Sequence, residues 1–175
     1  MTPGQRLRQL ANVLNGSTPL GLLLAGLAGT RTVGGPRGLV IATGYRWRLP
    51  FAGAFTVGNV IIYRAGPDAA LANPVLLRHE ERHSTQYAWC LGVPFVVFYF
   101  IAAVWSVLRT GDPASENLFE RQAGLAAGGY VDRGRRRPRW TAGRTFGRTS
   151  GGNAGEAAGG NADEAAGGNP GGTEA

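Results

Sequence analysis

The 175-residue chain has a single cysteine, two histidines and no lysine. Because Cys90 has no second cysteine to pair with, an internal disulfide framework is excluded and the fold depends on its hydrophobic core. All 18 basic residues are Arg, against 11 acidic residues, which gives a formal net charge of +7. A Lys-free chain rich in Gly and Ala is typical of a GC-rich genome, so part of this charge is compositional. We therefore expect no nucleic-acid partner.

Basic residues are absent from the end of the chain. Residues 150–175 hold four acidic residues and no Arg. Residues 151–158 read Gly-Gly-Asn-Ala-Gly-Glu-Ala-Ala and are nearly repeated in the next eight residues. Such a segment has almost no apolar side chain whose burial would offset the entropy of ordering it. We predict that 133–175 is a disordered tail, Arg-rich between Arg133 and Arg139 and then rich in Gly, Ala, Asn and Glu.

The spacing of apolar and breaker residues predicts an α+β fold that is mainly helical. Helices are expected over 4–15, 19–28, 74–91, 93–108 and 117–127. Two runs rich in β-branched and aromatic residues, 39–43 and 55–63, are predicted strands. These elements predict a small antiparallel sheet of two or three strands. We divide the chain into an N-terminal extension, 1–50, a domain over 51–132 and the tail.

Both histidines of the chain fall in one motif, His79-Glu80-Glu81-Arg82-His83, which fits H-E-x-x-H. Positions four apart lie on the same face of a helix, so His79 and His83 can bind one zinc ion together. Zinc lowers the pKa of the water that it binds, and Glu80 can accept the proton of that water as general base. The motif therefore predicts a zinc site with Glu80 as its catalytic residue.

The same motif has a second interpretation as a solvated helix face. Arg78, Glu81 and Arg82 could form ion pairs at the surface. Against this, the helix also carries an apolar face that includes Leu77 and Tyr87. The charged pair Glu81-Arg82 is unusual at the variable positions of such a motif, and it counts against catalysis more than against metal binding.

A catalytic zinc site needs a third protein ligand and leaves one position for water. Because the chain has no further His, an acidic residue must supply this ligand. Glu120 is the first candidate and Glu116 the second. Glu120 also has a structural interpretation, since Asn117 as N-cap with Glu120 at N3 resembles a capping box. Position alone does not decide between the two roles.

The motif and a segment downstream of it together resemble small bacterial zincin-like domains of the gluzincin type, which are metallopeptidase-like. The resemblance rests on Leu76-Leu77-Arg78-His79-Glu80-x-x-His83-x-x-Gln86-Tyr87, followed by Asn117-x-Phe119-Glu120-x-x-Ala123. It covers about 50–130 and departs from the group at Leu118, where Pro is frequent. It implies a zincin-like fold with His79, His83 and Glu120 as zinc ligands and Glu80 as base. Because members of this group are mostly of unknown substrate, it implies no particular substrate.

Two surfaces are candidates for partners. The strand over 55–63 is similar to the strand that edges the cleft in such domains, and it could pair with an extended peptide substrate. The uncharged stretch 91–108 reaches the lower length limit for a membrane span. A span would place His83 and Glu120 on opposite sides of the bilayer. We therefore favour a helix within the domain or dipping into one leaflet, with Arg133–Arg139 against an anionic surface.

The sequence supports two candidate functions. The first is a zinc-dependent metallopeptidase-like hydrolase, cytoplasmic or peripheral on the membrane. The alternative is a non-catalytic membrane-associated protein with a structural or degenerate H-E-x-x-H site, for which a single transmembrane helix at 91–108 stays open.

Overall fold

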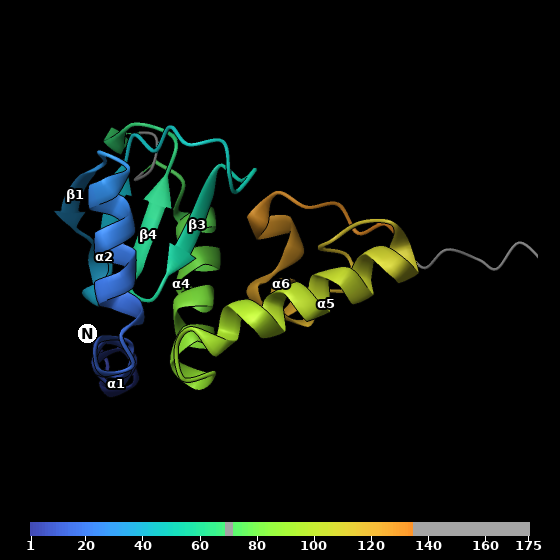
Figure 1. The fold of residues 1–175 in the computed structure, drawn as a ribbon, viewed down its shortest axis with the longest axis horizontal. Coiled ribbons are helices and arrows are strands. Elements are labelled where there is room, and N and C mark those ends of the chain that lie inside the picture. Colours follow the sequence, from blue (N-terminus) through green and yellow to red (C-terminus); the bar gives the residue numbers. More distant parts are fainter. Residues whose placement is uncertain (69–71, 135–175) are drawn as a thin grey trace, which may run out of the picture. The chain divides into compact units, whose positions relative to one another are not determined.

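A computed structural model describes residues 1–68 and 72–134 of the chain (Figure 1). In chain order the elements are α1 (Pro3–Leu14), α2 (Ser17–Leu27), β1 (Arg31–Gly34), the 3-10 turn η1 (Pro36–Gly38), β2 (Val40–Thr43), β3 (Ala54–Val57), β4 (Val60–Tyr63), α4 (Pro74–Trp89), α5 (Pro94–Thr110), α6 (Leu118–Ala123) and the 3-10 turn η2 (Leu125–Gly128). The predicted α+β, mainly helical fold is confirmed. Most of the predicted disordered tail, from 135 to 175, lies outside the described residues.

The sheet has four strands in the order β1-β2-β4-β3 and is mixed. β2 and β4 pair in parallel, whereas the β1–β2 and β3–β4 pairs are antiparallel. This corrects the predicted antiparallel sheet of two or three strands. The segment 55–63 is not one strand but a hairpin, because Gly58-Asn59 forms a two-residue turn between β3 and β4. β1 was not predicted, since all four of its residues are exposed and it has no buried apolar pattern.

Helices cover both faces of the sheet, α2 on one side and α4 on the other (Figure 1). The core on the α2 side is formed mainly by Ala25, Ala42, Tyr45, Val60 and Ile62. The core on the α4 side is formed by Leu39, Ile41, Ala54, Ile61, Tyr63 and Leu77. β4 is buried along its whole length, as expected of a central strand covered on both faces. The segment 1–50 supplies β1 and β2, so it belongs to the same sheet as the rest.

The hairpin turn between β3 and β4 is fixed to the N-terminal helices by buried polar groups. The Asn59 amide donates to the Thr18 hydroxyl at 2.9 Å, and the Asn12 amide donates to Asn59 Oδ1 at 3.0 Å and to the Ser84 carbonyl of α4 at 2.8 Å. At Gly58, where φ is +63°, an added Cβ would lie 2.5 Å from the Thr18 nitrogen. A side chain there is therefore excluded twice, by backbone conformation and by space. These contacts hold β3 in place beside α4.

A sharp bend separates α4 from α5. Leu91 and Gly92 adopt positive φ after α4 ends, and Pro94 begins α5 at an angle of 116°. α6 and η2 return to pack against α4. Within the described ranges, no single helix has the length and apolar composition to cross a membrane, although two bent pairs, α1 with α2 and α4 with α5, meet that criterion together.

Candidate metal centre

α4 places the two histidines of the motif on one buried face, as the sequence predicts. The Asn73 side chain caps the helix by accepting from the Leu76 N–H at 3.0 Å, and Pro74 occupies the first turn. His79 and His83 are 2% and 7% exposed, and their Nε2 atoms lie 3.1 Å apart. The solvated-face interpretation of this motif is therefore wrong.

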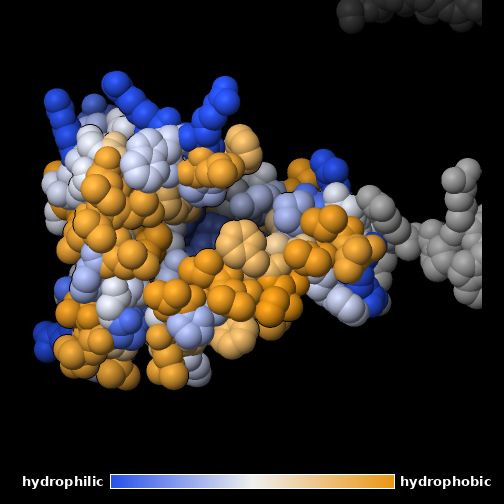
Figure 2. Space-filling model, in the orientation of Figure 1, coloured by the Kyte–Doolittle hydropathy of each residue, from blue (hydrophilic) through white to orange (hydrophobic). Residues whose placement is uncertain are grey.

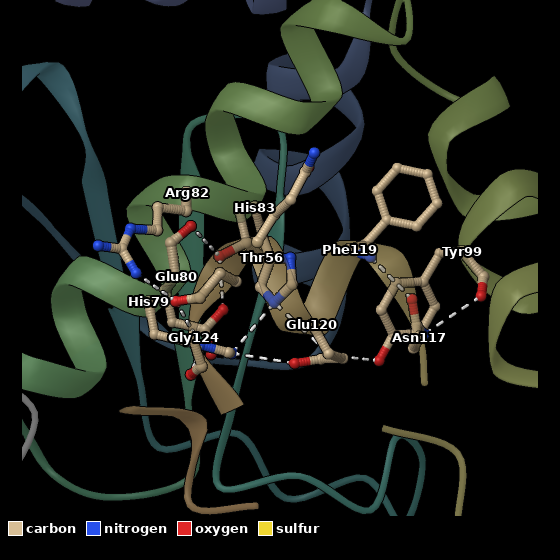
Figure 3. Close-up of polar contacts among 12 residues, drawn as sticks. Thr56, His79, Glu80, Arg82, His83, Tyr99, Asn117, Phe119, Glu120 and Gly124 are labelled. Carbon is tan, nitrogen blue, oxygen red and sulfur yellow. Dashed lines mark hydrogen bonds and ion pairs between the residues drawn. The ribbon is translucent and has the colours of Figure 1, made fainter. Parts of the chain in front are cut away.

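Glu120 closes the cluster from α6 (Figure 3). Its carboxylate oxygens lie 3.4 Å from His79 Nε2 and 3.7 Å from His83 Nε2, and the side chain is 2% exposed. One ligand atom from each of the three residues lies within 4.8 Å of the other two. The structure thus brings together the three residues predicted as metal ligands.

The structure also decides between Glu120 and Glu116 and between the two roles considered for Glu120. Asn117 caps α6 by accepting from the Phe119 N–H at 3.0 Å, but the Glu120 carboxylate faces the imidazoles and does not complete a capping box. Glu116, the second candidate, forms an ion pair with Arg109 at 3.2 Å. Glu120 is therefore the acid that meets the two histidines.

The other ring nitrogens of the histidines determine which tautomers are present. His79 Nδ1 faces the carbonyls of Ala123 and Gly124, at 3.2 and 3.1 Å, and these groups can only accept. His83 Nδ1 faces Gln86 Oε1 at 2.8 Å, and the amide orientation of Gln86 is set because its Nε2 donates to the Phe119 carbonyl at 2.9 Å. Both Nδ1 atoms therefore carry the proton and donate it, as metal-ligating histidines do. In the neutral imidazoles, which are the form that binds a metal, both Nε2 atoms are then unprotonated acceptors.

These acceptors converge on one point together with a carboxylate. Two Nε2 lone pairs face each other and Glu120, and Glu120 Oε2 is buried without a hydrogen-bond partner. Mutual repulsion of lone pairs and a carboxylate is relieved by a cation held between them. In a tetrahedral zinc site with Zn–N bonds of 2.0–2.1 Å, ligand atoms lie about 3.3 Å apart. The two Nε2 atoms lie 3.1 Å apart, His79 Nε2 lies 3.4 Å from Glu120 Oε2 and His83 Nε2 lies 3.7 Å from Glu120 Oε1, which are close to this separation.

Tyr99 on α5 holds the third ligand in place. Its hydroxyl donates to Glu120 Oε1 at 2.5 Å. Burial alone would raise the pKa of Glu120, but the two imidazoles and the Tyr99 hydroxyl outweigh it and lower this pKa to about 2. Burial would lower the pKa of His83, yet the carboxylates of Glu120 and Glu80 outweigh it and raise that pKa. The cluster thus favours the ionised form of Glu120, which is the form that a cation held by the three side chains would need.

Replacing Tyr99 with Phe should weaken metal binding without abolishing it. The substitution removes only the donor to Glu120, and loss of such an outer hydrogen bond typically lowers metal affinity by about 10–100-fold. Competition of the purified protein against a chromophoric zinc chelator measures the change. Tyr45→Phe is the matched control, because its hydroxyl donates to the Leu49 carbonyl on the other side of the sheet and its loss should leave zinc affinity unchanged.

Glu80 lies beside the cluster and is held by β3. The Thr56 hydroxyl donates to Glu80 Oε2 at 2.7 Å, and Glu80 is 3% exposed. Burial raises the pKa of Glu80, against the opposing influence of His83 and Thr56. A carboxylate with a raised pKa next to a metal cluster is the type of group that accepts a proton from water near neutral pH.

The two charged residues at the variable positions of the motif have separate structural roles. Arg82 Nη1 donates at 2.7 Å to the Ala123 carbonyl, which also accepts from His79 Nδ1. Glu81 points away from the cluster and bridges Arg8, at 2.8 Å, and Arg37, at 2.7 Å. Arg82 is exposed but hydrogen-bonded and Glu81 is paired with two Arg side chains, so both charged residues have a structural role in the fold.

Replacing Glu81 with Gln should destabilise the fold while leaving the metal cluster intact. Arg8 is almost fully buried, at 4% side-chain exposure, and Gln would leave its charge uncompensated. Removing one partner of a buried ion pair lowers the free energy of unfolding by about 3 kcal/mol. Urea denaturation measures this change. In the control, Asp132→Asn breaks a pair with Arg121 in which both side chains are more than half exposed, and it should cost less than about 1 kcal/mol.

Three residues of this centre have no role predicted from the sequence, although Gln86 is part of the motif that carries the resemblance. Gln86 had a usable signal, because it lies three positions after His83 and so shares its helix face. Thr56 lies in a predicted strand, but its approach to Glu80 depends on the hairpin register. Tyr99 stands in an apolar run where no local pattern marks it as a hydrogen-bond donor to Glu120.

The predicted basic run at the start of the tail is only partly described. Arg133 donates its backbone N–H to the Ser115 hydroxyl at 2.9 Å, and Arg135 to Arg139 lie outside the described residues.

Comparison of the chain with models of protein families, with curated proteins and with solved structures finds no match.

Proposed function

We propose that His79, His83 and Glu120 hold a zinc ion and that the protein is a zincin-like, metallopeptidase-type hydrolase with Glu80 as general base. The observation that carries the proposal is the convergence of two unprotonated Nε2 atoms on a buried carboxylate oxygen without a donor. Three protein ligands leave a coordination position open, which is the arrangement of catalytic rather than structural zinc sites.

The residues around the cluster suit this chemistry. When bound, zinc would polarise a substrate carbonyl and lower the pKa of water beside it. Glu80, oriented by the Thr56 hydroxyl, would accept the proton that this water gives up and pass it to the leaving amine. Gln86 and the carbonyls of Ala123 and Gly124 would keep both imidazoles in the ligating tautomer.

A peptide substrate is supported by the free edge of β3. β3 is the last strand of the sheet, and Arg64 donates to the Gly53 carbonyl at 3.0 Å on its β4 side. Because pairing alternates along an antiparallel strand, the backbone groups of Ala54 and Thr56 point to the other, open edge. The Thr56 side chain contacts Glu80, so an extended peptide added at this edge would run beside the proposed base. In Figure 2 the surface is hollowed between the sheet and the α5 region.

A structural metal site is the second candidate, and one observation favours it. The three ligands are no more than 7% exposed, so the cluster as described is closed to bulk solvent. A non-catalytic protein would need the ion only to hold α4 and α6 together. In that case zinc would be bound without hydrolysis of any peptide.

Metal analysis of the purified full chain tests the proposal. After zinc loading and desalting, the wild type should retain roughly one zinc ion per chain, whereas His79→Ala should retain almost none. The same preparations are assayed for release of amines from fluorescent casein. Equal, near-zero zinc in both proteins would exclude the metal site, and stoichiometric zinc without amine release would leave the structural alternative.

A further inference from the structure

The polar and apolar faces of α5 are exchanged relative to a helix on a water-exposed surface. The face that it turns to the protein carries Tyr99, Ser106 and Thr110, whose hydroxyls donate to Glu120 and to the carbonyls of Asp112 and Ser106. Its outer face carries eight large apolar side chains between Val97 and Leu108, each 42–71% exposed. Surface helices of soluble proteins show the opposite order, with apolar residues inward and polar residues outward.

α1 and α2 show the same inversion. The buried residues of α2 are Ser17, Thr18, Gly21 and Ala25, whereas the exposed ones include Leu23 and Leu27, at 58% and 67%. α1 buries Arg8 and Asn12 and exposes Leu7, Leu10, Val13 and Leu14. Three helices from two distant parts of the chain therefore expose most of their large apolar residues and bury mainly small or polar ones; Phe95 of α5 is the large apolar side chain that is buried.

Apolar side chains of all three helices are visible on one face of the molecule. Figure 2 shows apolar residues gathered on the viewed face over α1, α2 and α5, with hydrophilic side chains extending from one end. α2 carries no charge, and the single charge of α5, Arg109, lies 5.0 Å from the Trp105 ring at the end of the helix. Trp and Arg side by side are typical of the boundary between hydrocarbon and lipid headgroups. Soluble monomers rarely expose contiguous apolar patches larger than roughly a few hundred Å², and larger patches mark sites of protein or membrane contact.

We infer that the outer faces of α1, α2 and α5 are embedded in a lipid bilayer. The described residues contain 12 Arg against seven acidic residues. Arg8 and three of the acids, Glu80, Glu81 and Glu120, are engaged inside the protein, which leaves 11 Arg against four acids. The remaining surface is cationic and suits anionic headgroups around the embedded face. α5 then has a lipid-facing side and a side that holds Glu120 through Tyr99, so the metal cluster lies directly behind the embedded helix.

Flotation of the full chain with lipid vesicles tests this inference. The wild type should float with vesicles of phosphatidylcholine, more fully when phosphatidylglycerol is included, and should stay bound in high salt because apolar burial holds it. Ile101→Gln/Leu108→Gln on α5 and Leu23→Gln/Leu27→Gln on α2 should each lower the vesicle partition coefficient at least about tenfold. All four positions are exposed, and Gln retains good helix propensity, so both variants should fold.

Val75→Gln/Val131→Gln is the matched control. These valines are also exposed but lie outside α1, α2 and α5, and their replacement should leave partitioning unchanged. Wild-type protein that stays in the lipid-free fraction would overturn the inference. Flotation of both α5 and α2 variants as complete as that of the wild type would overturn it as well. A lipid-independent dimer that the same variants dissociate, without flotation, would replace the bilayer with a second copy of the chain.

Discussion

Glu80→Gln should leave zinc bound and lower the rate of peptide hydrolysis by about 10²–10⁴-fold. Gln has the same shape and can still accept the 2.7 Å hydrogen bond from Thr56, so the fold and the cluster are retained. It cannot accept a proton from water, because an amide oxygen is a very weak base. Zinc content and amine release from fluorescent casein, measured on the same preparation, separate the loss of chemistry from the loss of metal.

Glu81→Gln is the control for this variant. Glu81 follows Glu80 in the chain but pairs with Arg8 and Arg37, away from the histidines. At a temperature where Glu81→Gln remains folded, it should hydrolyse at the wild-type rate. Retained turnover in Glu80→Gln would show that Glu80 is not the base, even if zinc is bound.

Glu120→Gln should weaken zinc binding by about 1,000-fold. Zinc sites in small domains contribute about 10–16 kcal/mol of binding free energy. Loss of Glu120, the one anionic ligand among the three, is therefore expected to cost about 4 kcal/mol. The replacement can still accept from Tyr99, which keeps the packing of α6 against α5. Competition with a chelator of known affinity measures the loss.

Glu116→Gln provides the comparison, because Glu116 lies one helical turn before Glu120 and pairs with Arg109 instead of the histidines. Its zinc affinity should equal that of the wild type. Equal affinities in both glutamine variants would show that α6 supplies no ligand and that the cluster is a structural ion-pair network.

Local rules were sufficient for most of the helices and for the two histidine ligands. Asn73 with Pro74, and Gly92 with Pro94, mark the ends of α4 because capping and backbone restriction act within one turn. His79 and His83 were predicted as a pair because i,i+4 geometry belongs to the helix itself. Local rules alone left Glu120 with two possible roles, because its position depends on how the chain returns to α4. The resemblance of the surrounding segment favoured the role of metal ligand.

Contacts set by the tertiary fold could not be read from the sequence. The Gly58-Asn59 turn was missed although Gly-Asn between two strand-like runs is a hairpin signal, because runs rich in β-branched and aromatic residues on both sides are also typical of one long strand. The parallel pairing of β2 with β4 depends on β3 returning to the edge of the sheet. The inversion of α1, α2 and α5 was invisible as well, because periodicity shows that a helix has two faces but not which face turns inward.

X-ray absorption spectroscopy of the zinc-loaded full chain tests the central claim most directly. We expect a first shell of nitrogen and oxygen only, with the multiple-scattering signal of two imidazoles from His79 and His83 and one fewer light-atom ligand from protein in Glu120→Gln. Sulfur from Cys90 in the first shell, or the signal of a single imidazole, would contradict the assignment of the three ligands.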